Sequence, residues 1–409
     1  MKTIALISFF FLSTLQLFSQ EAGKIVFDSL ANKQIIRWEN GDSFIGLFKK
    51  TSDSTAVPDG LGTFYYSNGD QFIGTIKEGI KTGLGNYITL NKSSLKAIYV
   101  NNEPNGKGTL NLANGDVFEG EFKNGKKDGV GTIVFANGST YNGSFQFDKR
   151  WGKGTLNYVN GDSFTGDWEN DLQQGNGIYN WKDGSKYEGQ WRIGKENGDG
   201  TKTFANGDVY VGKWLDGKRS GVGTCTYFDG SVYIGQWLND AKNGSGKQSW
   251  KNGNRYEGIW KDGFQDGKGL AFFPNGIKYD GEWKFGMFNG IGTLTYPNGN
   301  VYSGEFKNDL KNGQGTLSFT NGEKYDGEWK NDIMEGKGSY FWTNGEKYVG
   351  TYENGARSGV GIHYFKNGNR YEGQWKNNLP NGIGSMIYPN GKKRTNHWEN
   401  GKIVGKKVN

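Results

Sequence analysis

The sequence predicts an all-β protein, built as an elongated and twisted antiparallel meander of stacked 23-residue β-hairpins. Three observations support this fold class. An aromatic residue recurs every 23 residues from Phe118 to Tyr371. Apolar and polar residues alternate inside each unit, as they do in a β-strand with one buried face. Asn-Gly pairs, which favour tight turns, separate the units. A fixed period in the range of about 20–50 residues indicates a repeat architecture, so we expect a linear array and not a globular enzyme.

The composition fits a packed β array better than a disordered chain. Glycine accounts for 69 of the 409 residues, and aromatic residues account for 15%. Glycine at this density, without the spacing of collagen, is often found in disordered chains. Disordered chains, however, lack aromatic rings to bury. The net charge of +7 is small for this length, so we expect no nucleic-acid partner.

The first twenty residues form a separate segment. Lys2 is followed by an apolar run over residues 4–18, and a polar stretch begins at Ser19. Such a run is shorter than the ~20 residues that a membrane-spanning helix needs, and it is typical of a secretory signal peptide. We expect residues 1–20 to be this signal peptide, with an uncleaved membrane anchor as the alternative. The protein is then exported, to the periplasm or outside the cell.

The repeats occupy most of the remaining chain. Residues 21–43 are expected to form an N-terminal cap or a degenerate repeat, because Trp38 and Gly41 match the end of a unit. Residues 44–393 hold about fifteen repeats. Residues 394–409 keep only part of the pattern, so we expect a partial repeat and a C-terminal cap there. Atypical terminal units are expected because an exposed sheet edge invites other chains to pair with it.

The unit that begins at Tyr279 predicts two strands. Tyr279, Gly281 and Trp283 alternate with polar residues, as the two-residue period of a pleated strand requires. A second segment repeats the alternation, with Gly292 and Leu294 on one face. Each unit is therefore expected to be one β-hairpin, and consecutive hairpins are expected to pair with one another.

Two connections join these strands. Asn298-Gly299 is expected to form a type I′ turn, because both residue types readily take the positive φ angles of that turn. The other connection, from Phe285 to Gly290, varies more between units and is expected to be a longer loop.

A single hairpin is not expected to be stable alone. Burial of its few rings does not offset the conformational entropy lost when 23 residues become ordered. Neighbouring units must supply the rest through shared rings and ladder hydrogen bonds, as in other repeat proteins. Gly281 fits this account, because the missing side chain between Tyr279 and Trp283 leaves room for a ring from the adjacent unit.

These residues resemble the MORN repeat (membrane occupation and recognition nexus). The features shared with that repeat are Tyr-x-Gly-x-Trp, a glycine in the following loop, a Gly-x-Gly pair and a terminal Asn-Gly. The clearest copy runs from Tyr256 to Gly263 and continues with Gly267-Lys268-Gly269. The resemblance extends from residue 44 to about residue 405, and it is to the exported, bacterial type of such proteins. It implies stacked hairpins and a role in protein interaction or at a membrane.

Residues suited to catalysis are scarce. The two histidines are His363, at an inward position that Leu294 fills elsewhere, and His397, in the C-terminal fragment. Neither is paired with a cysteine at metal-ligand spacing, and Cys225 is expected to be a buried core residue. Asn-Gly-Asp triplets hint at calcium, but that ion needs about six or more converging oxygens, and such triplets form turns in any case. We expect no catalytic site, metal, cofactor or small-molecule substrate.

The expected function is therefore that of a scaffold. Repeats of this family accompany the catalytic domain of plant phosphoinositide kinases, but here they leave no room for an ATP-binding domain. We expect a non-enzymatic, extracytoplasmic repeat scaffold that mediates protein–protein interaction or assembly, through a protein partner or self-association.

The connection after the first strand supplies one candidate surface. Apolar residues recur there in successive units and are expected to line one edge of the sheet, either as a protein contact or folded back over the sheet. The candidate interaction edge consists of Phe264, Met287, Phe288, Leu310, Ile333, Met334 and Leu379.

Basic residues in the same connection supply the alternative function, a membrane or lipid-surface binding module of the cell envelope. A basic patch is attracted to anionic head groups by about 1 kcal/mol per residue near the surface. The candidate contacts to an anionic lipid or envelope surface are Lys126, Lys127, Lys149, Arg150, Lys218 and Arg219.

Overall fold

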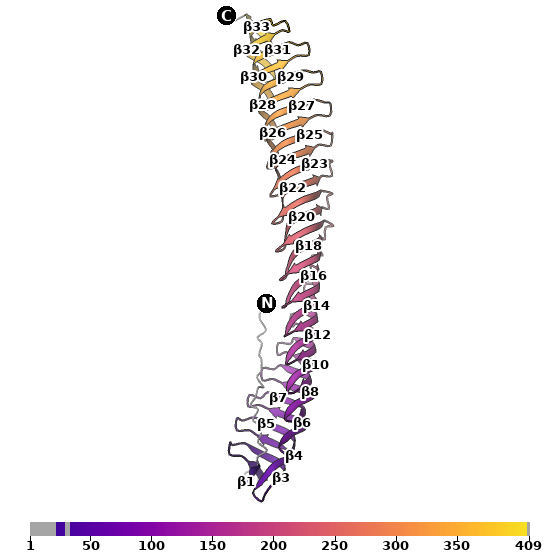
Figure 1. The fold of residues 1–409 in the computed structure, drawn as a ribbon, viewed down its shortest axis with the longest axis vertical. Helices are drawn as coiled ribbons and strands as arrows, with labels where there is room; N and C mark the ends of the chain where they lie inside the picture. Colours follow the sequence, from indigo (N-terminus) through magenta and orange to yellow (C-terminus); the bar gives the residue numbers. More distant parts are fainter. Residues whose placement is uncertain (1–21, 29–32, 407–409) are drawn as a thin grey trace. The chain divides into compact units, whose positions relative to one another are not determined.

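The computed structural model describes residues 22–28 and 33–406, which form 34 β-strands and no helix. The proposed signal peptide, residues 1–20, lies outside the described residues. The chain divides into two units, Met1–Gly198 and Asp199–Asn409, and strand β16 (Lys195–Thr203) contains their boundary. Within each unit the strands follow one another in chain order (Figure 1). The predicted all-β fold class is confirmed.

The strands of the first unit are β1 (Gly23–Asp28), β2 (Lys33–Arg37), β3 (Ser43–Lys50), β4 (Thr55–Tyr65), β5 (Gln71–Lys77), β6 (Ile80–Ile88), β7 (Ser94–Val100), β8 (Glu103–Asn111), β9 (Val117–Lys123), β10 (Lys126–Val134), β11 (Thr140–Gln146), β12 (Lys149–Asn157), β13 (Ser163–Glu169), β14 (Leu172–Asn180) and β15 (Lys186–Arg192).

The strands of the second unit are β17 (Val209–Leu215), β18 (Lys218–Thr226), β19 (Val232–Leu238), β20 (Ala241–Ser249), β21 (Arg255–Lys261), β22 (Phe264–Phe272), β23 (Lys278–Lys284), β24 (Met287–Thr295), β25 (Val301–Lys307), β26 (Leu310–Ser318), β27 (Lys324–Lys330), β28 (Ile333–Phe341), β29 (Lys347–Glu353), β30 (Ala356–Tyr364), β31 (Arg370–Lys376), β32 (Leu379–Ile387), β33 (Lys393–Glu399) and β34 (Lys402–Lys406).

The second unit is an antiparallel meander. From β17 to β34, each strand pairs with the strands before and after it in the chain. A typical repeat has a short strand of seven residues and a long strand of nine, as in β23 and β24. One repeat is therefore one hairpin, and its long strand pairs with the short strand of the next repeat, as β24 does with β25.

The first unit follows the same plan except at its beginning. There β1 pairs with β2 and also reaches across to β4, where Gly23 lies opposite Ala56. Ile36, Phe44 and Ala56 are fully buried beneath this arrangement. The ring of Trp38 stacks on Phe64 at a centroid distance of 5.1 Å. The N-terminal strands thus close over the first repeat, and the extra pairing shields β1 as an edge strand.

Alternation along the strands separates two faces. In β23, Tyr279 and Trp283 are buried on the face that we call the ring face, while Asp280 and Lys284 are exposed on the opposite face. The predicted alternation is confirmed.

The register lines up glycines on the ring face. Gly281 lies opposite Gly292 of β24, which in turn lies opposite Gly304 of β25. Glycines continue at the corresponding position of each strand in the second unit from Gly212 of β17 to Gly384 of β32. A row of side-chain-free positions therefore crosses the sheet at right angles to the strands.

The tyrosine of each repeat fills the space that these glycines leave. A Cβ added to Gly281 would lie 2.6 Å from the Tyr279 hydroxyl oxygen and 2.5 Å from the Cα of Gly292. The same tyrosine hydroxyl donates to the backbone carbonyl of Glu282 at 2.8 Å. The expectation that a ring from the adjacent repeat fills this space is wrong. The ring comes from the same strand, because Tyr279 lies flat along its own strand to reach that carbonyl.

Rings of adjacent repeats meet edge to face. Tyr256 lies 5.2 Å from Trp260 of its own repeat and 5.1 Å from Trp283 of the next, with interplanar angles of 89° and 81°. Perpendicular ring pairs at this distance are favourable. The indole nitrogen of Trp260 also donates to the carbonyl of Gly246 in the preceding repeat at 3.3 Å. Each repeat is thus joined to the next by a ring contact as well as by the hydrogen-bond ladder.

Both connections differ from the sequence-based expectation. At Pro297–Gly299, only Gly299 has positive φ (+83°), its amide donates to the carbonyl of Tyr296 at 2.9 Å, and the Tyr296 amide donates to the Asn300 carbonyl at 2.9 Å. This is a three-residue type I connection with a glycine bulge, so the predicted type I′ turn is wrong here. Three loop residues need positive φ only at the last of them.

The type I′ turn lies at the other end of the hairpin. Phe285 and Gly286 have φ of 50° and 80°, and they connect β23 directly to β24. The predicted long loop from Phe285 to Gly290 is therefore wrong. A glycine at position 290 is typical of a loop, because glycine readily adopts positive φ. Gly290 does have a φ of +85°, but it belongs to a bulge inside β24, where the register with β23 shifts between Gly281 and Trp283.

Replacing Gly281 with valine should lower the free energy of unfolding by about 3 kcal/mol, because the new side chain collides with the Tyr279 ring and with the facing backbone. Chemical denaturation of the full chain measures this change. Asp280→Val, at the exposed neighbouring position, is the control and should have a small effect. Equal stability of Gly281→Val and wild type would contradict this packing.

Candidate interaction surfaces

Cations lie over the rings on the ring face. They occupy the second position of the long strand, next to the type I′ turn. Arg219 of β18 lies 4.2 Å from the Trp237 ring of the following repeat, and Lys242 of β20 lies 4.8 Å from the Trp260 ring. Arg150 lies 4.3 Å from the Trp168 ring in the first unit. These cation–π contacts join neighbouring repeats.

The two arginines among these cations are also bound by the neighbouring turns. The Arg219 Nε donates to Asp240 Oδ1 at 3.1 Å, and its Nη2 donates to the Asp240 carbonyl at 2.9 Å. Arg150 makes the same two contacts with Asp171. Burial lowers the pKa of Lys242 to about 8 and also lowers the pKa of Lys127. Desolvation of this kind disfavours the charged amine.

The six basic candidate residues therefore divide into two sets. Lys127, Arg150 and Arg219 point to the ring face, where they are half-buried against rings. The other three are exposed on the opposite face at the first position of a long strand: Lys126, Lys149 and Lys218. Only the second set remains open to an anionic surface.

The apolar candidates divide in the same way. Phe288 stacks on Tyr279 at 3.8 Å and contacts Trp283 at 4.8 Å on the ring face. Met334 lies opposite Trp329 and is half-buried. These two residues are packing residues of the ring face. All seven candidates lie in strands, so the expectation that they occupy a loop is wrong.

The other five share one position on the opposite face. Each is the first residue of a long strand: Phe264, Met287, Leu310, Ile333 and Leu379. Phe264 is 52% exposed, Ile333 and Leu379 are 45% exposed, and Leu310 is 37% exposed. Phe264, Met287, Leu310 and Ile333 follow one another in successive repeats beside the type I′ turns, whereas Ala356 stands between Ile333 and Leu379. The Leu379 side chain lies next to Gly401 of the following turn.

A lysine, not predicted from the sequence, faces each of these apolar residues. The cross-strand pairs are Lys261–Phe264, Lys284–Met287, Lys307–Leu310, Lys330–Ile333 and Lys376–Leu379. We call these ten residues the lysine–apolar edge. The lysines are exposed, and none of them forms an ion pair within the part of the chain that the structure describes. Their 23-residue recurrence, one residue after the tryptophan position, could have indicated this row.

His363 and Cys225 are buried, whereas His397 is not. His363 is 6% exposed, and its ring nitrogens lie 3.1 Å from Glu346 and 3.1 Å from Arg357. Burial lowers the pKa of His363 and raises that of the buried Cys225 thiol. His397, in β33, is exposed.

The Asn-Gly-Asp turns use their carboxylates internally. The Asp162 Oδ1 accepts the Lys182 amide at 2.8 Å, and its Oδ2 accepts Asn160 Nδ2 at 2.9 Å and the Tyr179 hydroxyl at 3.0 Å. The aspartate thereby links one turn to the next turn along the sheet. Among residues 22–28 and 33–406, no three potential metal ligands gather at one point.

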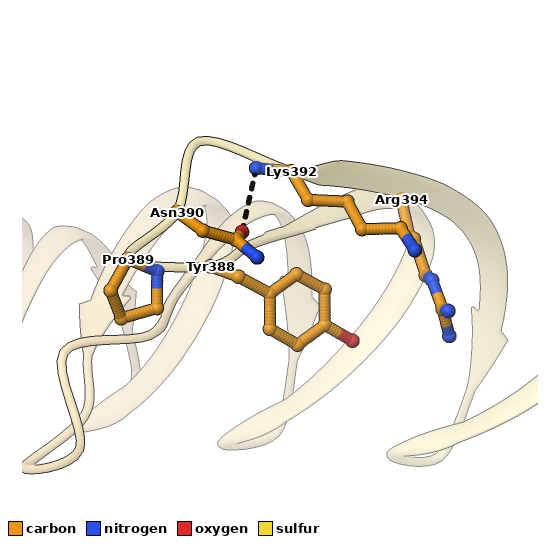
Figure 2. A pocket seen from close by; sticks show the side chains of 5 residues that line it. All are labelled: Tyr388, Pro389, Asn390, Lys392 and Arg394. Atoms are coloured by element: carbon orange, nitrogen blue, oxygen red, sulfur yellow. Dashed lines mark hydrogen bonds between the residues drawn. The ribbon is translucent and has the colours of Figure 1, made fainter.

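A shallow hollow of about 490 Å³ lies at the last three-residue turn (Figure 2). Tyr388, Pro389, Asn390, Lys392 and Arg394 line it. The Lys392 amide donates to Asn390 Oδ1 at 3.1 Å. Arg394 stands 23 residues after Tyr371, where other repeats have the ring that covers the glycines, and its guanidinium lies 5.9 Å from the Tyr388 ring. Arg394 thus takes the place of that ring at the end of the array and lines the hollow.

No helix in the described ranges is long and apolar enough to cross a membrane.

The sequence matches the family model of the MORN repeat. The match covers residues 57–71 and 98–117 and then twelve consecutive stretches of 23 residues, from 118–140 to 371–393. The chain matches no curated protein.

Two solved structures show a distant likeness to the chain. The TCP10 domain of Danio rerio CPAP, in complex with a peptide of Danio rerio STIL, is 16% identical and has a TM-score of 0.24; the likeness covers 57% of this chain and 94% of that one. Virginiamycin B lyase from Staphylococcus aureus is 9% identical with a TM-score of 0.12, covering 80% of this chain and 96% of that one. Likeness at this level says nothing about the function of this chain.

Proposed function

The chain belongs to the MORN repeat family, and from this premise we propose that it is a non-enzymatic scaffold that binds a protein partner or a second copy of itself. The main support is the lysine–apolar edge. Soluble proteins bury most large apolar side chains, and a continuous exposed row of them marks a contact surface. Protein interfaces combine an apolar core with a polar, solvent-accessible rim, and the edge lysines lie where such a rim is expected.

The different roles of the two faces also favour the lysine–apolar edge as the binding surface. Tyrosine and tryptophan on the ring face are almost completely buried, and they hold adjacent repeats together. Changes there would weaken the fold. The residue at the first position of the long strand takes no part in this ring packing, and its identity varies, from Lys149 in the first unit to Leu310 in the second. A partner is therefore best accommodated at this position.

An extracytoplasmic location is part of the proposal. It rests on the apolar run of residues 4–18, which follows Lys2 and has the length of a signal-peptide core. A non-enzymatic role is supported by the contacts of three groups: His363 bonds to the Glu346 carboxylate, Cys225 is buried, and the turn aspartates accept backbone amides.

Docking on an anionic lipid or envelope surface is the second candidate function. The supporting observation is the cross-strand pair of Lys123 and Lys126, both exposed, with Lys149 exposed in the next repeat. Co-sedimentation with vesicles that contain anionic lipid should fall on adding salt and should weaken in Lys126→Gln/Lys149→Gln. Binding that ignores both changes would argue against this candidate.

Affinity capture from the native cell envelope tests the scaffold. Phe264→Ser/Ile333→Ser removes two exposed side chains of the edge and should reduce the recovered partner, or the self-associated fraction, at least about tenfold. Val222→Ser/Val360→Ser is the matched control, because both valines are exposed on the same face away from the edge. Equal recovery with both variants and wild type would contradict the proposal. Fractionation of the same cells locates the mature chain.

A further inference from the structure

Phe285 occupies a position that its backbone disfavours. It is the first residue of a type I′ turn, with φ of 50° and a side chain 62% exposed. Bulky side chains are rare in this left-handed conformation, whereas asparagine and aspartate tolerate it. The other turns mostly obey that preference, with Asn101, Asn124, Asn170, Asp216, Asn239, Asp262, Asn308, Asn331, Asn354, Asn377 and Asn400 at the equivalent position.

Folding alone does not account for this phenylalanine. A residue that strains the backbone and leaves most of its ring in water gives the fold less than asparagine would. Strained residues of this kind are typical of functional positions.

Glu78 and two bulky apolar residues share the conformation, but the surroundings of the two apolar residues differ from those of Phe285. Phe147 and Ile193 have φ of 49° and 50° and lie next to Lys149 and Lys195, the first residues of the following long strands. Lys126 lies 5.6 Å from the Phe147 ring, and Lys284 lies 6.0 Å from the Phe285 ring, so a nearby lysine is common to both.

Phe285, by contrast, is part of a row of apolar side chains. Its ring lies 6.4 Å from the ring of Phe264, and Met287 begins the strand that follows it. Phe285 therefore continues the lysine–apolar edge, whereas Phe147 does not.

The spacing of this edge selects the shape of a partner. Each repeat contributes two strands, so equivalent residues recur every ~9.6 Å at about 4.8 Å per strand. Seven residues of an α-helix rise about 10.5 Å, so a helix with an apolar residue at every seventh position meets one apolar residue in each repeat. An extended chain covers a similar distance in about three residues, but residues three apart point to opposite faces.

The apolar row has a defined length, because it is interrupted after four repeats. It is uninterrupted over Phe264, Met287, Leu310 and Ile333, and Ala356 then replaces the large side chain, with Glu353 in place of the lysine. Three intervals of about 9.6 Å span ~29 Å, the length of a helix of about 20 residues.

The charge of the edge selects the chemistry of the partner. Lys284, Lys307 and Lys330 flank the apolar row. The nearby Asp309 and Asp332 use one carboxylate oxygen each to accept the backbone amides of Phe288 and Lys311, at 2.7 and 2.9 Å. The three lysines are themselves exposed and form no ion pair among the described residues, so they are available to carboxylates from outside the chain.

We propose that the lysine–apolar edge of the second unit, with Phe285, binds an acidic amphipathic α-helix of a partner protein. The apolar residues of that helix recur every seven residues and lie along the apolar row, and its carboxylates meet the lysines. The proposal rests on the scaffold function above and adds the class of partner.

Fluorescence anisotropy with the full chain tests this proposal. The probe is a labelled helix of about 21 residues, with leucine at every seventh position and glutamate beside it. It should bind wild type with a Kd on the order of 10–100 μM. A peptide of the same composition with leucine at every sixth position should bind at least about tenfold more weakly.

Phe285→Asn separates binding from folding. Asparagine suits the turn, so the variant should melt at the same temperature as wild type or higher, while its affinity for the probe falls at least about tenfold. Phe147→Asn is the matched control: the same change in the same type of turn should leave binding unaltered. Unchanged binding by Phe285→Asn, equal binding of the two peptides, or no binding at about 1 mM peptide would overturn the proposal.

Two further outcomes would contradict the proposal that a helix binds the edge but would leave the proposed scaffold function standing. Anionic vesicles that bind wild type but not Phe285→Asn would make the occupant a membrane. A molecular mass that doubles in wild type but not in Phe285→Asn would make it a second copy. The probe peptide could fail to bind while capture of a partner from the envelope still depends on the edge. That result would contradict the acidic helix as the partner and leave the scaffold function standing.

Discussion

The contact on which the structure depends is that of a tyrosine ring lying over a pair of facing glycines. Tyr279 can lie flat only because Gly281 and Gly292 have no side chains. In that position its ring meets Trp283 of its own repeat and Phe306 of the next, at 5.3 and 5.1 Å. The missing side chains thus bring the rings of neighbouring repeats together, and a hairpin too small to fold alone gains the core that it lacks.

This contact explains which parts of the fold could be predicted from the sequence. The 23-residue period and the alternation around Tyr279 predict strands, hairpins and the buried face correctly, because ring burial dominates the packing. The prediction places the shorter turn at the wrong end of the hairpin, because Asn298-Gly299 suits either turn type and only the number of loop residues decides between them. Gly290 resembles a loop glycine, but its positive φ serves a bulge inside a strand. Local propensity does not distinguish these cases.

The candidate surface was predicted only in part, for a related physical reason. A shift of one residue along a strand moves a side chain to the other face. Met287 and Phe288 were grouped because they are adjacent, yet one lies on the exposed edge and the other stacks on Tyr279. Lys126 and Lys127 divide in the same manner. With the bulge correctly placed, the register assigns each residue to its face and pairs each edge lysine with an apolar neighbour.

Hydrogen exchange measured by mass spectrometry on Tyr256→Ala tests the central claim, that each repeat is stabilised by the next one through its rings. The account predicts faster amide exchange in the repeat of Tyr256 and also in β23 and β24, which hold Trp283, with residues 348–364 unaffected. Acceleration confined to β21 and β22 would show that each hairpin is stable by itself, and it would contradict the account.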